Sequence, residues 1–363
     1  MLKFIHGADF HLDSPFSGLD PQQAIQRRKE QRELLEKLVQ VAQEKQVQFV
    51  LLSGDLLDGQ TTYRETALAL AEELGKLTCP VFISPGNHDY YHRTSLYAGN
   101  FWSENVHIFK SSKIEQVALD AQNCVVYGRA FQAQQETQSP LQGFSVAQDG
   151  RMHIMALHAQ VDGKGNYAPI TREQIAESGL DYLALGHVHL YDGLQQEGKT
   201  HWAYAGCPEG RGFDETGEKG VLLVTLDEQD GCQVEQIPLA KRRYHVQTID
   251  ISHADDPAAA IWMALDGEPK QDIYRIYLTG TRENSLNLNH LHHELEPLVY
   301  SVVLYDQTKT EQMVWSRIEE DTLTGRFLRQ MAIMIQASPE DETLQQAVRF
   351  GLAALEHGED VAP

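Results

Sequence analysis

The chain has 363 residues, of which 42% are hydrophobic and 23% charged, a composition typical of a globular protein of about two domains. Its formal net charge of −22 is unlike the basic surface of general nucleic-acid-binding proteins. The acidity suits a protein that concentrates divalent cations or meets a basic partner, although acidity for solubility alone explains it equally well. No apolar run predicts a membrane span, and the N-terminus enters a strand without the shape of a signal peptide, so we expect a cytoplasmic protein. The four cysteines are scattered, which favours reduced thiols over a disulfide framework or a zinc site.

The first predicted strand, residues 2–6, leads into a loop that carries Asp9 and His11. These residues are two positions apart, so in an extended segment both side chains face the same side. A carboxylate and an imidazole on one side can chelate a single ion. The alternative is that Asp9 caps a turn and that His11 is incidental.

An alternation of helices and strands follows. Apolar residues at helical spacing predict an amphipathic helix over about 21–46, and a second helix is expected over about 61–77. Between them, the apolar run 47–52 predicts a strand that ends in Gly54 and Asp55. With the next strand at 81–83, the β-α-β-α-β order predicts right-handed crossovers and a largely parallel sheet.

The strand at 81–83 delivers a loop of sequence Ser-Pro-Gly-Asn-His-Asp, in which Asn87 offers a metal an oxygen and His88 can carry a proton. The tetrapeptide Gly-Asn-His-Asp, taken alone, is equally plausible as an ordinary polar turn. However, ligands of parallel sheets bind outside the carboxyl ends of the strands, and this loop shares that edge with the loops of Asp9 and Asp55. We therefore expect these side chains to converge.

The middle of the chain supplies the remaining histidines. Residues 106–109, 114–119 and 124–128 are interpreted as strands of a meander, followed by a strand at 152–158 that ends in His158. A short helix is expected over 171–178 with Thr171 as its N-cap. The apolar strand 182–185 then ends in Gly-His-x-His, which places His187 and His189 two positions apart so that both reach the same centre.

The predicted ligands are carboxylates, one amide and imidazoles, with no thiolate, which suits Mn²⁺ first and also Fe²⁺ or Zn²⁺. The set comprises Asp9, His11, Asp55, Asn87, His158, His187 and His189. These are too many for one ion and fit two ions that share Asp55. Two ions about 3.5–4 Å apart clamp a phosphate for in-line displacement and lower the pKa of a bridging water.

The order Asp-x-His, Gly-Asp, Gly-Asn-His-Asp, His and Gly-His-x-His resembles the calcineurin-like metallophosphoesterases over roughly residues 1–225. The resemblance implies an α/β fold, a four-layer metallophosphoesterase sandwich with a smaller α/β capping domain and C-terminal helices. It also implies that His88 is the general acid or transition-state stabiliser and that Asp89 orients it.

Within this family the sequence is similar to DNA repair exonucleases. The protein phosphatases of the family carry an Arg soon after Gly-Asp-x-x-Asp to hold a phosphomonoester dianion, whereas here Asp58 is followed by Gly59. Three segments resemble the nuclease subunit of the bacterial SbcCD complex and its eukaryotic counterpart, and within these the YhaO-type group. They are the Gly-Asp-x-x-Asp-Gly stretch, residues 8–13 and the turn Tyr-x-Gly-x-Pro-Glu at 204–209. The Arg-rich segment expected after Glu209 is thin, with Arg211 alone, which together with the acidity puts duplex affinity in doubt.

The C-terminal third changes character. We expect a nuclease domain over 1–240, a capping, DNA-contacting domain over 241–310 and a helical segment over 311–363. The basic cluster Lys241, Arg242 and Arg243 is a candidate phosphate contact or a solvated linker. The β-α-β-α-β pattern of 244–304 is similar to the capping domain of those nucleases. Its tyrosines, Tyr274, Tyr277 and Tyr305, are candidates for base stacking or for the core.

Two C-terminal helices, over about 322–336 and 339–357, carry apolar stripes that either pack together or, as the resemblance implies, dock a coiled-coil SMC-like ATPase. We therefore predict a two-metal phosphodiesterase, a DNA exonuclease of DNA repair with such an ATPase partner, and the resemblance also allows a homodimer. The alternatives are a phosphoesterase for a small nucleotide or a phosphomonoester, and a metal-bound scaffold for an ATPase.

Overall fold

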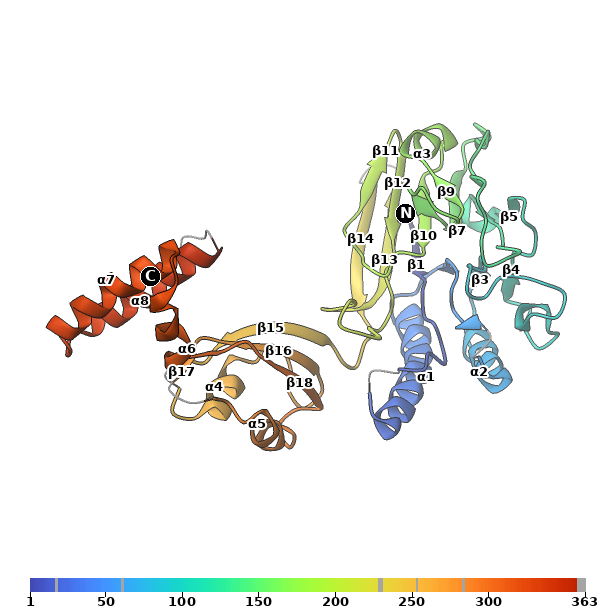
Figure 1. The fold of residues 1–363 in the computed structure, drawn as a ribbon. Coiled ribbons are helices and arrows are strands. Elements are labelled where there is room, and N and C mark those ends of the chain that lie inside the picture. Colours follow the sequence, from blue (N-terminus) through green and yellow to red (C-terminus); the bar gives the residue numbers. More distant parts are fainter. Residues whose placement is uncertain (17–18, 60–61, 228–230, 253, 283–284, 358–363) are drawn as a thin grey trace. The chain divides into compact units, whose positions relative to one another are not determined.

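The computed structural model describes residues 1–363 except 17–18, 60–61, 228–230, 253, 283–284 and 358–363 (Figure 1). The chain divides into two compact units, Met1–Tyr244 and His245–Pro363. Among the described residues no helix combines the length and apolar character that crossing a membrane requires. The four cysteines are free thiols.

The first unit contains a six-stranded sheet in the order β14-β13-β1-β2-β3-β4 (Figure 1). Its parallel half is formed by β1 (Leu2–Gly7), β2 (Phe49–Leu52), β3 (Val81–Ile83) and β4 (Val106–Ile108). The antiparallel strands β13 (Gly220–Asp227) and β14 (Gly231–Pro238) extend the other side of β1. The parallel core of this sheet confirms the crossover connections expected from the helix–strand alternation.

A second mixed sheet has the order β11-β12-β10-β7-β6-β5. Its strands are β5 (Glu115–Leu119), β6 (Cys124–Gly128), β7 (Met152–His158), β10 (Tyr182–Gly186), β11 (Gln195–Glu197) and β12 (Thr200–Tyr204). The predicted meander is wrong, because β4 pairs in parallel with β3 in the first sheet whereas β5 and β6 form a hairpin in the second. Short apolar runs between turns look the same in sequence whether the chain continues a sheet or crosses to another. A short parallel pair, β8 (Gln160–Val161) and β9 (Pro169–Ile170), lies outside both sheets.

The two sheets pack face to face, with helices on their outer faces. Alternate residues of β1 show the layering, because Phe4 belongs to the cluster between the sheets and Ile5 to the cluster under α1 (Pro21–Glu44) and α2 (Arg64–Gly75). Phe4 stacks on Phe49 with ring centroids 4.8 Å apart. A third cluster, which includes Ile175 of α3 (Arg172–Ser178), covers the outer face of the second sheet. This is the α/β sandwich of two mixed sheets that the family resemblance implies.

Helix boundaries follow capping chemistry. Asp20 accepts hydrogen bonds from the backbone N–H groups of Gln22 and Gln23, and Pro21 begins α1. Thr171 caps α3 as predicted, in a reciprocal capping box with Gln174. Single turns of 3₁₀-helix lie at η2 (Leu96–Ala98) and η3 (Asp120–Gln122).

The second unit begins with a three-stranded sheet in the order β15-β16-β18, in which β16 and β18 are parallel. The strands are β15 (Tyr244–Asp250), β16 (Ile273–Thr279) and β18 (Ser301–Asp306), with α4 (Pro257–Ala264) and α5 (Leu288–Leu295) between them in sequence. Side chains of both helices join the buried cluster of this sheet, which includes Ile261, Ile276 and Leu291. The short strands β17 (Thr281–Arg282) and β19 (Lys309–Thr310) pair beside it. The order of elements is the β-α-β-α-β pattern expected for residues 244–304.

The chain ends in α6 (Glu311–Ser316), η4 (Arg317–Glu319), α7 (Leu323–Ala337) and α8 (Glu342–His357), and α7 and α8 lie side by side (Figure 1). Their apolar stripes meet in one cluster that contains Leu328, Met331, Val348 and Leu352. The expectation that these stripes pack on each other is therefore confirmed. A smaller set of apolar side chains on these helices is exposed.

Candidate metal centre

The predicted ligands follow the carboxyl ends of strands in both sheets. Asp9 follows β1, Asp55 follows β2 and Asn87 follows β3 in the first sheet, while His158 ends β7 and His187 follows β10 in the second. The backbone is strained at this edge, with positive φ angles at Asp9 (55°), Asp55 (51°) and His187 (108°). Non-glycine residues adopt such angles rarely, and they persist where the surrounding structure requires a side chain in one place.

Close backbone approaches explain two glycines of the motifs. A Cβ added to Gly86 would lie 2.2 Å from Oδ1 of Asp55, and one added to Gly186 would lie 2.1 Å from the carbonyl oxygen of Ser53. Any side chain at either position would push the ligand loops apart. Gly86 therefore sets the distance between the β2 and β3 loops of the first sheet, and Gly186 the distance between a loop of the second sheet and the first.

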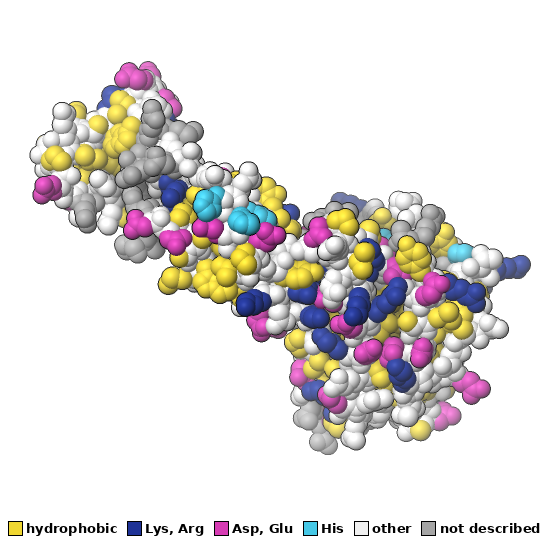
Figure 2. Space-filling view, turned by 90° about the horizontal axis from the view of Figure 1, so that it is seen from below, with side chains coloured by type: hydrophobic (Ala, Val, Ile, Leu, Met, Phe, Trp, Pro, Cys, Tyr) yellow, Lys and Arg dark blue, Asp and Glu magenta, His cyan; other side chains and the backbone are white. Residues whose placement is uncertain are grey.

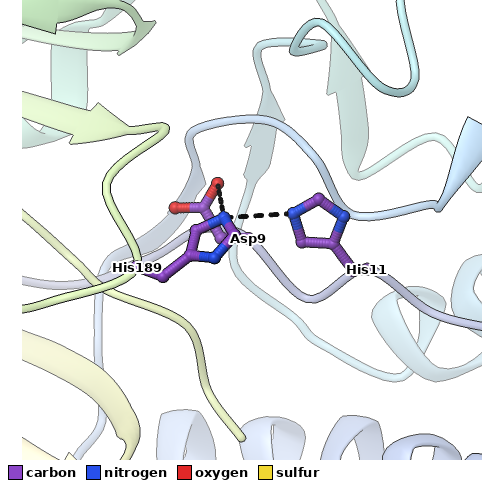
Figure 3. Close-up of side chains that lie close together, drawn as sticks. All are labelled: Asp9, His11 and His189. Atoms are coloured by element: carbon purple, nitrogen blue, oxygen red, sulfur yellow. Dashed lines mark hydrogen bonds and ion pairs between the residues drawn. The ribbon is translucent and has the colours of Figure 1, made fainter. Parts of the chain in front are cut away.

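Asp9, His11 and His189 form the first group of donors (Figure 3). Their ring nitrogens point at one another, with Nε2 of His11 3.3 Å from Nε2 of His189, and Nε2 of His189 lies 3.8 Å from Oδ1 of Asp9. Asp55 reaches the same group, because its Oδ2 lies 3.8 Å from Nε2 of His11.

Carboxylates behind both rings fix the tautomers. Nδ1 of His11 lies 3.3 Å from Oδ1 of Asp58, and Nδ1 of His189 lies 2.6 Å from Oε1 of Glu215. Arg211 places Nη2 2.9 Å from the same Nδ1 of His189, but the nearer carboxylate selects the tautomer with Nδ1–H. Each Nε2 then presents a lone pair to the other across 3.3 Å, an arrangement that a cation between them satisfies.

His158, Asn87 and Asp55 form the second group. Nε2 of His158 lies 2.9 Å from Oδ1 of Asn87 and 3.4 Å from Oδ2 of Asp55, while its Nδ1 lies 2.9 Å from the carbonyl oxygen of Ser53. The His187 ring packs edge-on against His158, with centroids 5.3 Å apart, and its backbone N–H donates to Asp9. Asp55 thus stands between the two groups, where a ligand shared by two ions is expected.

The electrostatics of the pocket favour added positive charge. Burial alone would lower the pKa of His158, but the carboxylate of Asp55 beside it raises that pKa to about 9. Burial lowers the pKa values of His11 and His187 to about 4, so both rings are neutral at neutral pH and can offer lone pairs. A pocket that holds a proton on a fully buried imidazole has a negative potential, which a divalent ion would also satisfy.

His88 lies at the mouth of this cluster. Its backbone N–H donates to Oδ1 of Asp55 (2.9 Å), and its ring Nδ1 lies 3.2 Å from Oδ1 of Asp58. The side chain is 44% exposed, so part of the ring is open to solvent. The hydrogen bond with Asp58 raises the pKa of His88, which favours the protonated form.

Asp89 has a different position from the one expected. Its carboxylate accepts hydrogen bonds from the backbone N–H groups of Leu56 (2.7 Å) and Gly86 (2.7 Å) and from the hydroxyl of Tyr97 (2.6 Å). It therefore joins the Asp55 loop to the His88 loop, and the expectation that it orients His88 is corrected: Asp58 does so. The family resemblance implied this role for Asp89, whereas the turn directs its side chain back to the backbone.

The basic cluster is largely engaged within the protein. Arg242 is 7% exposed and donates two hydrogen bonds to Glu30, at 2.6 and 2.8 Å. Lys241 and Arg243 lie 3.5 Å from Glu30 and Glu218, respectively. Figure 2 shows Lys and Arg interspersed with Asp and Glu on the visible face of the larger body. Arg242 thus has a structural role that leaves it poorly placed for phosphate, and DNA contact by its two neighbours stays a prediction.

Two functional side chains had weaker sequence signals. Asp58 stands three residues after Asp55 in Gly-Asp-x-x-Asp, so its spacing was visible although its partner was not. Glu215 lies in the irregular segment between β12 and β13, with no motif around it. Only the fold brings Glu215 to His189.

Three comparisons relate this chain to known proteins. A family model described as calcineurin-like phosphoesterase matches residues 2–191. The uncharacterized metallophosphoesterase YhaO of Bacillus subtilis (strain 168) is 33% identical over 243 residues, which are 63% of this chain and 58% of that protein. The match therefore spans less than two thirds of that relative's length. Among solved structures, a dimetal phosphatase from Danio rerio is similar with a TM-score of 0.39 and 13% identity, over 65% of this chain and 98% of that one.

Proposed function

Because this chain belongs to the calcineurin-like phosphoesterase family, we propose that it is a two-metal phosphodiesterase that degrades DNA as an exonuclease in DNA repair. Family membership and the clustered Asp and His side chains make it a metal-dependent phosphoesterase. The choice of a diester over a monoester rests on one observation in the site, the absence of a cation directly after Asp58, and the choice of DNA rests on the resemblance of residues 8–13 and 204–209 to DNA exonucleases.

The donor set fits two divalent ions. Asp9, His11 and His189 would hold one ion, and Asn87, His158 and His187 the other, with Asp55 shared between them. Two such ions supply positive charge to a phosphate and acidify a water at neutral pH. Mn²⁺ is the ion that we expect first for this mixture of imidazole and oxygen donors, and Fe²⁺ or Zn²⁺ would also suit it.

His88 and Asp58 would manage the proton of the leaving group. Asp58 contacts Nδ1 of His88 and favours the protonated ring, in which Nε2 also carries a proton. Donation of that proton to the departing oxygen avoids the release of an alkoxide, a contribution of about 10²–10⁴ in rate. Asp58 also touches His11, so one carboxylate orients both the acid and a ligand.

The loop Gly54–Gly59 favours a diester over a monoester. A phosphomonoester dianion carries one more negative charge than a diester at neutral pH, and enzymes commonly hold that charge with a guanidinium. Here Gly59 follows Asp58. A Cβ added to Gly59 would lie 2.9 Å from the carbonyl oxygen of His88. A side chain there would be strained, and residues 54–59 include no Lys or Arg, so this loop offers no such cation.

A second candidate is hydrolysis of a small nucleotide or a phosphomonoester. Arg211 favours it, since its guanidinium lies beside His189 and is 21% exposed. The net charge of −22 also repels a long polyanion more than a small substrate. In the DNA hypothesis, Arg211 instead serves to hold Glu215 behind His189.

We also propose that the C-terminal helices dock a coiled-coil SMC-like ATPase. Although α7 and α8 bury their facing stripes, Leu323, Ile333 and Met334 of α7 are 68%, 62% and 43% exposed. A metal-bound scaffold without catalysis is the remaining alternative, which the outward-facing His88 disfavours.

A panel of metals and substrates tests this function. The purified chain is assayed with Mn²⁺, Fe²⁺, Zn²⁺ and Mg²⁺ on single-stranded DNA, duplex DNA, bis-p-nitrophenyl phosphate and p-nitrophenyl phosphate, with Asp55→Asn as the inactive control. We expect Mn²⁺-dependent degradation of DNA from its ends and a diester rate above the monoester rate. Rapid monoester hydrolysis without DNA degradation would instead establish the second candidate.

A further inference from the structure

The sheet of the second unit has one covered and one open face. Tyr274, Ile276 and Leu278 of β16 point into the cluster with α4 and α5 and are buried. The alternate residues Arg275 and Tyr277 therefore point to the opposite face. The neighbouring strands contribute exposed side chains to this face, including Val246 (45%), Val303 (36%) and Tyr305 (43%).

Three of these side chains form an ordered group, which we call the tyrosine face: Arg275, Tyr277 and Tyr305. Tyr277 and Tyr305 are register partners in β16 and β18, and their rings stack with centroids 5.1 Å apart and an interplanar angle of 22°. The guanidinium carbon of Arg275 lies 6.0 Å from the centroid of the Tyr305 ring. Because β18 is the last strand of the three-stranded sheet, the stack has no further strand beyond Tyr305.

We propose that the tyrosine face binds single-stranded nucleic acid, with nucleobases stacking on the two tyrosines and Arg275 near a phosphate. Aromatic rings on an open sheet with an adjacent guanidinium suit this ligand, because every base presents a π-face and the backbone between bases presents an anion. The inference rests on the proposed function, since it supplies a contact for the strand that the metal centre would cut.

The surrounding charges indicate stacking as the main source of affinity. Asp250 and Asp306 end the flanking strands and are exposed, so the area around the tyrosine face is not strongly basic. Binding that depended on phosphate contacts would require several cations and would weaken steeply with salt. With Arg275 as the cation of this face, the affinity should fall only slightly with ionic strength.

A protein partner fits this face less well. Although Tyr and Arg are common in protein interfaces, the other exposed apolar residues of this face, Val246 and Val303, are small and add no further large anchor. A tyrosine stack beside a single guanidinium matches repeated planar groups better than a continuous apolar surface.

The test uses the full-length protein with EDTA, so that binding is measured without hydrolysis. The probe is fluorescein-labelled oligothymidylate of about 20 nucleotides, long enough to span several stacking positions. A strand of equal length with abasic sites provides the matched ligand, because it keeps the phosphates and lacks the bases. We expect the abasic strand to bind much more weakly and the affinity for oligothymidylate to depend little on salt.

Three variants locate the contact. Tyr305→Ala should weaken binding of oligothymidylate at least about fivefold, whereas Tyr305→Phe, which keeps the ring, should bind nearly as the wild type does. Trp262→Ala is the matched control, because Trp262 is a similarly exposed aromatic residue (39%) on α4, which packs on the covered face. Turnover of bis-p-nitrophenyl phosphate should be unchanged in all three.

The outcomes separate this inference from the proposed function. Equal binding by wild type and Tyr305→Ala, or equal affinity for the abasic strand, would overturn the inference even if the protein degrades DNA. If Tyr305→Ala changed the sedimentation coefficient and left DNA binding unchanged, the tyrosine face would be a protein interface. Base-dependent binding in a protein that cuts no DNA would sustain the inference and refute the exonuclease.

Discussion

The two units of this protein have similar β-α-β connections, but their candidate functional side chains lie at different places in the fold. In Met1–Tyr244 the titratable side chains gather at the carboxyl ends of parallel strands and are buried, as Asp9 (1%) and His11 (1%) show. In the second unit the conspicuous side chains lie on an open sheet face, where Tyr305 is 43% exposed. Within the described residues, the clusters that could hold a metal all lie in the first unit. Strand ends bring together donors that are distant in sequence, whereas a sheet face repeats one kind of contact.

Backbone strain follows the same division. Among described residues, every non-glycine residue with positive φ lies in the first unit, and Asp9, His11, Asp55 and His187 are among them. Such conformations cost about 1–3 kcal/mol each and persist at functional sites where packing enforces them. The sandwich core thus holds the ligand loops in a geometry that the loops alone would not adopt.

The comparison makes Asp55 the most sensitive residue, because its carboxylate stands between the two donor groups. We expect Asp55→Asn to lose metal and nearly all activity, more than the roughly 10–100-fold effect of removing a residue behind a ligand, while the protein stays folded. Asp162→Asn is the matched control, since Asp162 also has a positive φ (54°) and pairs with surface Arg172. Metal content by plasma mass spectrometry and diester turnover provide the readouts. Two bound ions and full activity in Asp55→Asn would remove its bridging role.

His88 should separate catalysis from metal binding. Its side chain is 44% exposed and contacts Asp58, so we expect His88→Ala to keep both ions while kcat falls about 10²–10⁴-fold. The exposed His92 supplies the control variant His92→Ala, with wild-type kinetics expected. A parallel loss of metal content and activity in His88→Ala would make His88 a ligand instead.

Glu215 should have a smaller effect, exerted through His189. Replacing it with Gln removes the charge that holds Nδ1–H, and we expect metal affinity to fall about 10–100-fold with partial rescue by excess Mn²⁺. Glu197→Gln, which removes only a surface pair with Arg172, should leave the affinity unchanged. Titration with Mn²⁺ followed by activity measures the shift. If Glu215→Gln bound metal like the wild type, its contact with His189 would have no functional role.

His6 should give the smallest effect, on stability alone. Its ring is fully buried between Tyr182 and Leu185, and burial lowers its pKa from 6.5 to about 3. Between these values the unfolded chain binds the proton and the folded chain does not, so stability is lost as pH falls below about 6.5, by up to about 1.4 kcal/mol per pH unit. Urea unfolding with EDTA at several pH values, compared with the non-titrating His6→Gln, isolates this contribution. The same pH slope in both proteins would exclude a contribution from His6. A difference in slope confined to the unfolding transition of the first unit would sharpen the comparison of the two units.

Much of the fold was predictable from local signals. Periodicity and capping residues indicated α1, α3 and the parallel strands, and the Gly-Asp and Gly-His-x-His motifs indicated which strand ends meet. The two-sheet arrangement was harder to predict, because residues 106–128 carry no signal that assigns β4 to one sheet and β5 to the other. Strand β14 was not predicted, because its many polar residues, such as Gln233 and Glu235, give a weak strand signal.

Residue roles at the site depended on side-chain direction. A motif placed Asp89 next to His88, but the turn directs its carboxylate to backbone N–H groups of the Asp55 loop. Likewise Arg242 belongs to a basic run in sequence, while the fold buries it against Glu30 of α1. Sequence identified the chemistry of the centre, and only tertiary structure assigned the residues behind the ligands.

The division of labour between the units is tested most directly by comparing the full chain with a fragment of residues 1–244. Both are assayed on long single-stranded DNA and on bis-p-nitrophenyl phosphate, after circular dichroism and metal content have shown that the fragment is folded and loaded. If the first unit alone performs the chemistry and the second guides DNA, the fragment should keep most of its turnover of the small diester, and degradation of long DNA should fall by more than about tenfold. Equal loss of both activities in a folded, metal-loaded fragment would contradict the account, because the second unit would then complete the catalytic centre itself.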